Sequence, residues 1–215
     1  MFAMSAVRDR PSLREEQKAL TRRRLLDAAE VVFARRGFHG ASVDEIAREA
    51  GATTGALYSN FSGKEDLFLA LFERSAQADV SDYAEIFTTQ AAPEEQTRAV
   101  ADLWMRILRE RPHYFPLVIE FWSYAMREPG LREPLAERFR TLREASARLV
   151  TQGAERHGIS LSPEFAQRLG LLITALGNGL ALEKLLDPEA IADETYGELL
   201  TLIFGAFGEL ARRST

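Results

Sequence analysis

Residues 42 to 65, with the sequence SVDEIAREAGATTGALYSNFSGKE, restrict what this chain can fold into more than any other segment. A serine precedes a glutamate by three positions at 42–45 and again at 62–65, and this capping-box pattern is typical of helix starts. Between the two boxes, Gly51 can end one helix, and the threonine pair that follows can begin another. The segment therefore predicts a short helix, a tight turn, a second short helix and then a longer one. That arrangement is typical of the helix-turn-helix that reads DNA.

Helical patterns continue along nearly all of the remaining chain. Apolar residues between Glu15 and Arg36 recur at helical spacing, and Gly37 then offers a helix stop. After the long helix that starts near Ser62, prolines and glycines divide the sequence into about five further helices. These breaks fall at 92–93, 111–112, 129–134, 158–163 and 187–188. Because no segment alternates polar and apolar residues as a strand does, we predict an all-α fold.

The charge of the chain is unevenly distributed. Residues 1–64 carry 11 lysines and arginines against 8 acidic residues, a net charge of +3, whereas residues 65–215 carry 16 against 24, a net charge of −8. A basic segment joined to an acidic one is what a nucleic-acid-binding part on a larger body would show. We therefore predict a disordered tail over residues 1–12, a three-helix DNA-binding domain over 13–64, and a larger helical domain over 65–215.

The residues on which many enzymes depend are scarce in this chain. It has no cysteine, which excludes disulfides, thiolate-bound zinc and thiol catalysis. Its three histidines, His39, His113 and His157, are far apart and are not at metal-ligand spacing. The sequence contains no nucleophile-elbow or phosphate-loop motif. We therefore expect no enzymatic activity, no metal and no cofactor.

Two further segments concern the location of the protein. The first residues, MFAMSAVRDRPSLREEQ, contain no sustained apolar run of the kind found in secretory signals. The most apolar later stretch, residues 169–182, is interrupted by Asn178 and is shorter than the roughly 20 residues that a bilayer-spanning helix needs. We expect a cytoplasmic protein with no membrane partner.

The residue order of the central segment resembles that of a known family. The string Ile46-Ala47 … Ala50-Gly51 … Gly55-Ala56-Leu57-Tyr58 … Asn60-Phe61 … Lys64-Glu65 … Leu67 is similar to the signature of the TetR family of bacterial transcriptional repressors. The resemblance covers about a quarter of the chain, from residue 20 to residue 72. It implies a homodimer that binds a palindromic double-stranded DNA operator and is released by a small-molecule effector, with residues 65–215 forming the ligand-binding and dimerisation domain. A DNA-binding dimer without a ligand, acting constitutively or through a protein partner, is an open alternative.

The resemblance and the side-chain chemistry together give candidate DNA contacts. These are Ser42, Thr53, Thr54, Gly55, Ala56, Tyr58, Asn60, Lys64, Arg22 and Arg23. Threonine hydroxyl and methyl groups can contact base edges, and Gly55 would let the backbone approach the DNA closely. Because the second short helix has no arginine, lysine or glutamine, we expect specificity from thymine-methyl contacts and DNA shape. A packing role for Tyr58, and an ordinary solvated helix face for the arginines, are alternatives.

Two C-terminal segments carry the predicted dimer interface. Small side chains recur every three or four residues along the first, and an apolar face extends along the second. The candidate residues are Gly170, Thr174, Gly177, Ala181, Leu199, Ile203, Phe207 and Leu210. A helix that is apolar around most of its circumference must be buried on several sides, so we expect both helices to pack into the body and into a second copy. The alternative is an interior helix of a monomeric bundle.

Aromatic residues gather in residues 113–126, HYFPLVIEFWSYAM, where we expect an effector pocket. The candidate ligand contacts are Trp104, His113, Phe115, Glu120, Phe121, Trp122, Tyr124 and Asn178. Aromatic walls with a few polar groups favour a small hydrophobic or aromatic effector. The same aromatic residues could instead form an ordinary helical core.

Overall fold

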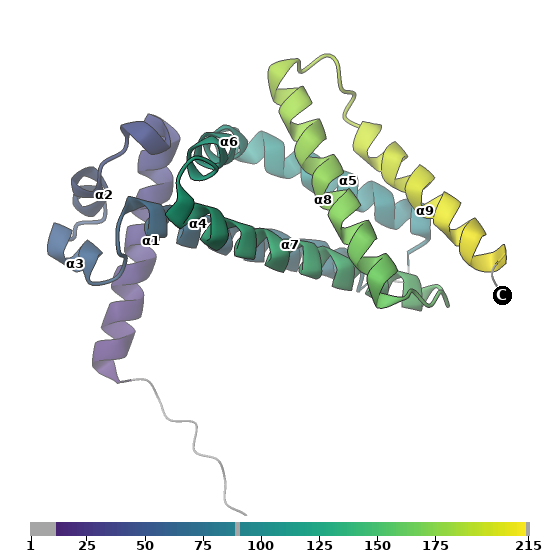
Figure 1. The fold of residues 1–215 in the computed structure, drawn as a ribbon, viewed down its shortest axis with the longest axis horizontal. Helices are drawn as coiled ribbons and strands as arrows, with labels where there is room; N and C mark the ends of the chain where they lie inside the picture. Colours follow the sequence, from purple (N-terminus) through teal and green to yellow (C-terminus); the bar gives the residue numbers. More distant parts are fainter. Residues whose placement is uncertain (1–11, 89–90, 214–215) are drawn as a thin grey trace, which may run out of the picture. The chain divides into compact units, whose positions relative to one another are not determined.

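The computed structural model describes residues 12–88 and 91–213, with side chains described as far as residue 206. This part of the chain contains nine α-helices and no strand, which confirms the predicted all-α fold (Figure 1). The helices are α1 (Leu13–Gly40), α2 (Val43–Glu49), α3 (Thr54–Tyr58), α4 (Lys64–Ile86), α5 (Pro93–Glu110), α6 (Tyr114–Ala125), α7 (Pro129–Arg156), α8 (Pro163–Leu186) and α9 (Thr195–Arg213). Of the tail predicted over residues 1–12, all but the last residue lies outside the described residues.

The chain divides into two compact units between Leu71 and Phe72, called here the head and the body. Helix α4 runs across this division, so its first two turns belong to the head. The boundary predicted from the sequence lies earlier, at the start of α4. The difference arises because Leu67 and Phe68 are buried in the core of the head, where the Phe68 ring lies 5.5 Å from that of Phe33.

Aromatic and aliphatic side chains form the core of the head. The ring centroids of Phe33 and Phe38 are 5.9 Å apart, and those of Phe38 and Phe68 are 5.5 Å apart. Helices α2 and α3 add Ile46 and Leu57, both fully buried. Helices of seven and five residues are too short to be stable alone, and each buried side chain contributes about 1.5–3 kcal/mol. Tertiary packing therefore holds the two short helices in place.

The helix starts and stops of the head follow the predicted signals with one difference, at the start of α4. The Ser42 hydroxyl accepts a hydrogen bond from the Glu45 amide at 3.1 Å, and Gly51 after α2 has a φ of +59° that favours glycine. At Gly37, where φ is +69° and ψ is 176°, the backbone leaves helical geometry as the predicted stop requires, and a further helical turn then extends α1 to residue 40. After Ser62, α4 begins two residues later, and the Ser62 amide donates to the Asp66 carboxylate at 2.9 Å.

In the body, α7 packs along α8, and α5 packs along α9 (Figure 1). A Cβ atom built at Gly170 of α8 would lie 2.7 Å from the carbonyl oxygen of Arg143 and 2.8 Å from the amide nitrogen of Ala147, both in α7. The two backbones therefore approach so closely that only glycine fits. Helices α5 and α9 are joined by a hydrogen bond of 2.9 Å between the hydroxyls of Thr97 and Thr201.

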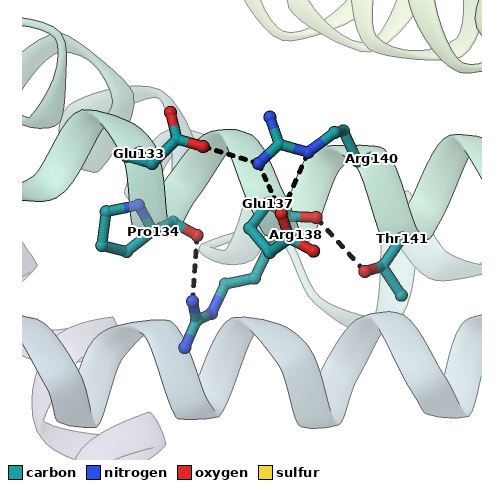
Figure 2. Close-up of polar contacts among 6 residues, drawn as sticks. All are labelled: Glu133, Pro134, Glu137, Arg138, Arg140 and Thr141. Atoms are coloured by element: carbon teal, nitrogen blue, oxygen red, sulfur yellow. Dashed lines mark hydrogen bonds and ion pairs between the residues drawn. The ribbon is translucent and has the colours of Figure 1, made fainter.

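Helix α7 begins at Pro129, as the break predicted there requires, but it continues through Pro134. Figure 2 shows how the turns around this proline are bonded. The Arg138 guanidinium donates to the Pro134 carbonyl at 2.9 Å, and Arg140 pairs with Glu133 at 2.7 Å and also with Glu137. Such exposed pairs contribute about 0–1 kcal/mol each, so they support the helix only weakly. Pro134 lies beyond the first turn of α7, so it removes one main-chain hydrogen bond and crowds the carbonyl group four residues earlier, at a cost of about 3 kcal/mol.

Helix α8 is, among the described residues, the one helix that length and composition alone would allow to cross a membrane. In the structure, Ala166, Leu169 and Ala181 of this helix are buried within the body. Part of its apolar character is therefore explained by packing against other helices of the same chain.

Candidate functional site

The second helix of the helix-turn-helix, α3, has one buried face and one exposed face. Leu57 is fully buried and anchors α3 in the core of the head, whereas Thr53, Gly55 and Tyr58 are exposed, Tyr58 by 57% of its surface. A Cβ atom at Gly55 would have only the Thr53 hydroxyl within 4 Å, at 3.9 Å. The packing of the head therefore does not require glycine at this position, and the space above it is open.

The hydroxyl groups near α3 already make one interaction each within the head. The Thr53 hydroxyl accepts from the Ala56 amide at 3.0 Å, and Ser42 caps α2 in the same way. Each of these two hydroxyls keeps its own proton for a further hydrogen bond. The Thr54 hydroxyl instead donates to the Asp44 carboxylate at 2.7 Å, which ties α3 to α2. Thr53 and Ser42 are therefore better placed than Thr54 to donate to a phosphate or a base.

Lys64, a predicted phosphate contact, bonds to the main chain of the head in this structure. The Lys64 ammonium donates to the carbonyl oxygens of Phe38 at 2.8 Å, Ala41 at 3.0 Å and His39 at 3.4 Å. It also lies 4.6 Å from the centre of the Phe38 ring. An ammonium group has three N–H donors, and all three are used by main-chain oxygens at the end of α1. Lys64 thus caps α1 and fixes the start of α4 against it.

Arg22 and Asn60 also serve the head itself. Arg22 donates to the Asn60 carbonyl oxygen at 2.9 Å and lies 4.2 Å from the centre of the Phe61 ring. The Asn60 side chain donates to the Ala56 carbonyl at 2.8 Å, so its amide nitrogen turns back toward α3. Arg23 is exposed on α1. Of the two predicted arginines, Arg23 is therefore the better placed to contact a phosphate.

The third arginine of the same run, Arg24, also bonds within the head. Arg24 donates to the carbonyl oxygen of Ala50 at a distance of 2.7 Å. Ala50 is the last residue before the turn of the helix-turn-helix. A run of three arginines gives no signal that distinguishes a residue bonding to this turn from one facing solvent. Arg24 therefore joins Arg22 in holding α1 against the two short helices.

The body contains a cavity of about 450 Å³ bounded by α4 through α9. Four of the predicted ligand residues line it, namely Trp104, Phe115, Trp122 and Asn178. The other four, His113, Glu120, Phe121 and Tyr124, are not among the lining residues. Helical geometry explains the division, because positions 115, 118 and 122 share one face of α6. Phe121 is instead buried in packing, with its ring 6.4 Å from that of Tyr124, and His113 is exposed.

Several cavity residues were not predicted from the sequence. Asp79 and Tyr83 of α4 and Tyr196 of α9 line the cavity. Burial raises the pKa of Asp79, an effect opposed by its ion pair with Arg111. Burial also raises the pKa values of Tyr83 and Tyr196, so both phenols keep their protons. The two tyrosines are isolated aromatic residues in otherwise ordinary helical patterns. The prediction of ligand contacts therefore rested on the aromatic-rich segment at residues 113–126 instead.

The small side chains of α8 do not face outward as the predicted dimer interface requires. Gly170 is in contact with α7, and Ala181 is fully buried within the body. Gly177 and Thr174 line the cavity, and the Thr174 hydroxyl lies 3.4 Å from that of Ser146 in α7. These four residues therefore pack within one chain, and their assignment to a contact with a second copy is corrected.

Apolar residues that do face outward lie on the same two helices. Leu199 and Ile203 of α9 are partly buried, and the side chains of Phe207 and Leu210 lie outside the described residues. The exposed leucines of α8 and α9 are Leu171, Leu172, Leu182, Leu185, Leu186 and Leu202. Leu186 and Leu202 are exposed over 74% and 69% of their surface. Such a concentration of exposed leucines on two helices is typical of a protein–protein interface.

Two family models match this chain. The model described as bacterial regulatory proteins of the tetR family matches residues 25–71. The model described as the C-terminal part of BetI-type transcriptional repressors matches residues 93–202, about half of the chain. The first covers most of the head and the second most of the body.

The similar proteins are regulators of transcription. The transcriptional activator FasR of Mycolicibacterium smegmatis is 33% identical over 99 residues, which are 46% of this chain and 45% of FasR. The transcriptional regulator UidR of Escherichia coli is 26% identical over 153 residues, which are 71% of this chain and 76% of UidR. This chain therefore matches less than half of the length of FasR and about three quarters of UidR.

Solved structures share the fold at lower identity. The fatty acid degradation regulator FadR from Bacillus halodurans has a TM-score of 0.63 and 20% identity, covering 84% of this chain and 94% of FadR. A candidate regulator from Saccharomonospora viridis in complex with choline has a TM-score of 0.63 and 20% identity, covering 85% of this chain and 94% of that chain. With the matches to both parts of the sequence and the helix-turn-helix of the head, these findings show that this chain belongs to the TetR family of bacterial transcriptional regulators.

Proposed function

We propose that this protein is a cytoplasmic transcriptional repressor that binds a palindromic operator as a homodimer and leaves the DNA when a small apolar or aromatic effector enters the cavity of the body. The observation that supports this function most directly is the orientation of α3. Leu57 is buried in the head, while Thr53, Gly55 and Tyr58 are exposed together. A short helix anchored on one side and presented on the other is the arrangement that enters a DNA major groove.

The chemistry of this face gives the proposed mode of reading. Ser42, Thr53 and Tyr58 donate hydroxyl protons to phosphates or base edges, and Thr54 and Ala56 offer methyl groups to thymine. Arg23 adds a phosphate contact from α1. Because α3 has no arginine, lysine or glutamine, discrimination between sequences comes mainly from apolar contacts and DNA shape.

Gly55→Ala tests whether the backbone of α3 approaches DNA. The variant should be as stable as the wild type or slightly more stable, because the added methyl meets open space and alanine favours a helix by about 1 kcal/mol. Its dissociation constant for a duplex selected in vitro with the wild-type protein should rise about tenfold, since the methyl would stand between α3 and the bases. Fluorescence anisotropy and thermal unfolding measure the two quantities.

The control for this experiment is Gly130→Ala in α7, where an added Cβ atom also meets nothing within 4 Å. It should likewise be as stable as the wild type or slightly more stable, and it should leave DNA affinity unchanged. Equal affinity of the Gly55→Ala variant and the wild type would remove α3 from the proposed DNA contact.

The second copy is proposed to bind the exposed leucines of α8 and α9 rather than the small side chains of α8. Leu171, Leu186 and Leu202 lie on these two helices and are exposed in one chain. Covering them with the same helices of a partner would remove a large apolar surface from water, which favours a twofold homodimer. Such a dimer presents two α3 helices, as a palindromic operator requires.

Leu202→Glu should weaken this self-association about a hundredfold, because it would place an unpaired carboxylate in the proposed interface. Size-exclusion chromatography with light scattering, run over a dilution series, measures the shift from dimer to monomer. The matched control is Met126→Glu, since Met126 at the end of α6 is 68% exposed but is not on α8 or α9. If the Leu202→Glu variant stays dimeric at the dilutions where the control does, the interface lies elsewhere.

A further inference from the structure

Two buried donor groups converge on one glycine of the cavity wall. A Cβ atom built at Gly177 of α8 would lie 3.4 Å from the hydroxyl oxygen of Tyr196 in α9 and 3.5 Å from the indole nitrogen of Trp104 in α5. The centroids of the two rings are 4.9 Å apart. The missing side chain at residue 177 thus leaves a small open volume beside both groups, called here the Gly177 niche and defined by Gly177, Trp104 and Tyr196. All three residues line the cavity.

The two donors of the Gly177 niche are removed from bulk water. Trp104 is 6% exposed and Tyr196 is 4% exposed. Within the described part of the chain, no hydrogen bond joins the indole N–H of Trp104 or the phenol of Tyr196 to another residue, and neither polar atom is among the fully enclosed ones without a partner, so both are open to the cavity that these residues line. Burial raises the pKa of Tyr196, so its hydroxyl is protonated and able to donate at neutral pH. Buried polar groups in proteins are normally bonded, so these donors are suited to an acceptor on a molecule that enters the cavity.

The charges around the cavity restrict which molecule this can be. The acidic residues and the histidine that line it are Asp79, Glu94 and His157, and its described lining includes no lysine or arginine. The Asp79 carboxylate already pairs with Arg111, so a carboxylate held there would find no lysine or arginine on the wall to pair with. A cation would be repelled at the niche itself, because an indole N–H and a phenol O–H both present the positive ends of their dipoles. An uncharged acceptor satisfies both conditions.

We propose that the Gly177 niche holds the oxygen atom of an uncharged, mostly apolar effector, and that this oxygen accepts hydrogen bonds from the indole of Trp104 and the phenol of Tyr196. A carbonyl or a hydroxyl oxygen meets this requirement. The apolar part of the same molecule packs against Phe115, Val118 and Ile173, which line the cavity on α6 and α8. The inference rests on the proposed function in that it takes this cavity to be the effector site.

The test compares three probes that carry the same decyl chain: its methyl ketone, its carboxylate and its trimethylammonium salt. Each is titrated into the full-length protein, and binding is followed by isothermal calorimetry and by the fluorescence of the two tryptophans, both of which line the cavity. We expect the ketone to bind at least about tenfold more tightly than either charged probe, because only the ketone completes the niche without an unpaired charge.

Two alanine variants of α8 locate the oxygen. Gly177→Ala places a methyl group in the niche at ordinary contact distance, so the protein should fold normally while its affinity for the ketone falls about tenfold. Gly179→Ala adds the same methyl two residues further along α8, where nothing lies within 4 Å, and should bind the ketone as the wild type does. Tyr196→Phe, which removes one donor, should weaken ketone binding by about three- to tenfold.

Three results would overturn the proposal: tighter binding of the carboxylate or the ammonium probe than of the ketone, no binding of any probe, or equal affinity of the ketone for the Gly177→Ala variant and the wild type. A DNA measurement separates this outcome from the fate of the proposed function. If the ketone binds through the niche but does not release the selected duplex, the proposal of effector-controlled repression is wrong and the proposal for the Gly177 niche is supported. If only a charged probe binds in the cavity and releases the duplex, effector-controlled repression is supported and the proposal for the niche is wrong.

Discussion

Gly170→Ala should destabilise the body by about 3 kcal/mol, even though alanine is the better helix former by about 1 kcal/mol. The added Cβ atom would lie 2.7 Å from the carbonyl oxygen of Arg143, 2.8 Å from the amide nitrogen of Ala147 and 3.1 Å from the Cβ atom of Ala147. Two of these three atoms belong to the backbone of α7, so no side-chain rotation can relieve the contact. Helices α7 and α8 must move apart and lose packing along their whole contact.

Differential scanning calorimetry or thermal unfolding followed by circular dichroism measures this loss. The control is Gly179→Ala in the same helix, which gains the same helix propensity and meets no atom within 4 Å. It should be as stable as the wild type or more so. If Gly170→Ala unfolds at the same temperature as Gly179→Ala, the close approach of α7 and α8 is not a feature of the protein in solution.

Lys64→Met should destabilise the head by about 3 kcal/mol, because three carbonyl oxygens at the end of α1 lose a charged donor together. Methionine keeps much of the length and apolar character of the lysine stem, so the loss reports mainly the ammonium group. Urea unfolding followed by circular dichroism measures the change. Lys18→Met, on the exposed face of α1, is the matched control and should leave stability unchanged.

The same Lys64→Met variant separates a capping role from a phosphate contact. If Lys64 neutralised a phosphate, its loss would reduce the slope of log affinity against log salt concentration by about one for each head. Because its donors are bonded to α1, we expect the slope for the folded variant to equal that of the wild type. A reduced slope with unchanged stability would restore the phosphate contact.

The helical framework could be predicted from local signals in the sequence. Proline placed the starts of α5 and α7, glycine and serine placed the breaks around α2, and the apolar spacing gave α1. These signals act within a few residues, so one sequence is enough to interpret them. At Gly37 the backbone leaves helical geometry as its glycine signal predicts, and no local signal in the sequence indicated the further turn that extends α1 to residue 40.

The candidate sites were less predictable, because the same side chain can bind a group of its own chain or a similar group of another molecule. A lysine finds an oxygen acceptor equally in a phosphate and in a carbonyl group, and Lys64 takes the carbonyls of α1. The stripe of small residues on α8 indicates that another helix comes close, but not whether that helix belongs to the same chain. Gly170 shows that it does. On α6, the aromatic sequence did not reveal which face meets the cavity, since that depends on how α6 packs against its neighbours.

The arginines of the head and Lys64 have a consequence for how the protein finds its target. Arg22, Arg24 and Lys64 bond to main-chain oxygens, while Arg35 and Arg36 pair with glutamates of α2. Five of the eleven lysines and arginines in residues 1–64 are thus bonded within the head, which leaves fewer of them to displace counterions from arbitrary DNA. We therefore expect the binding of non-cognate duplex to depend less steeply on salt concentration than the composition of this segment alone would suggest.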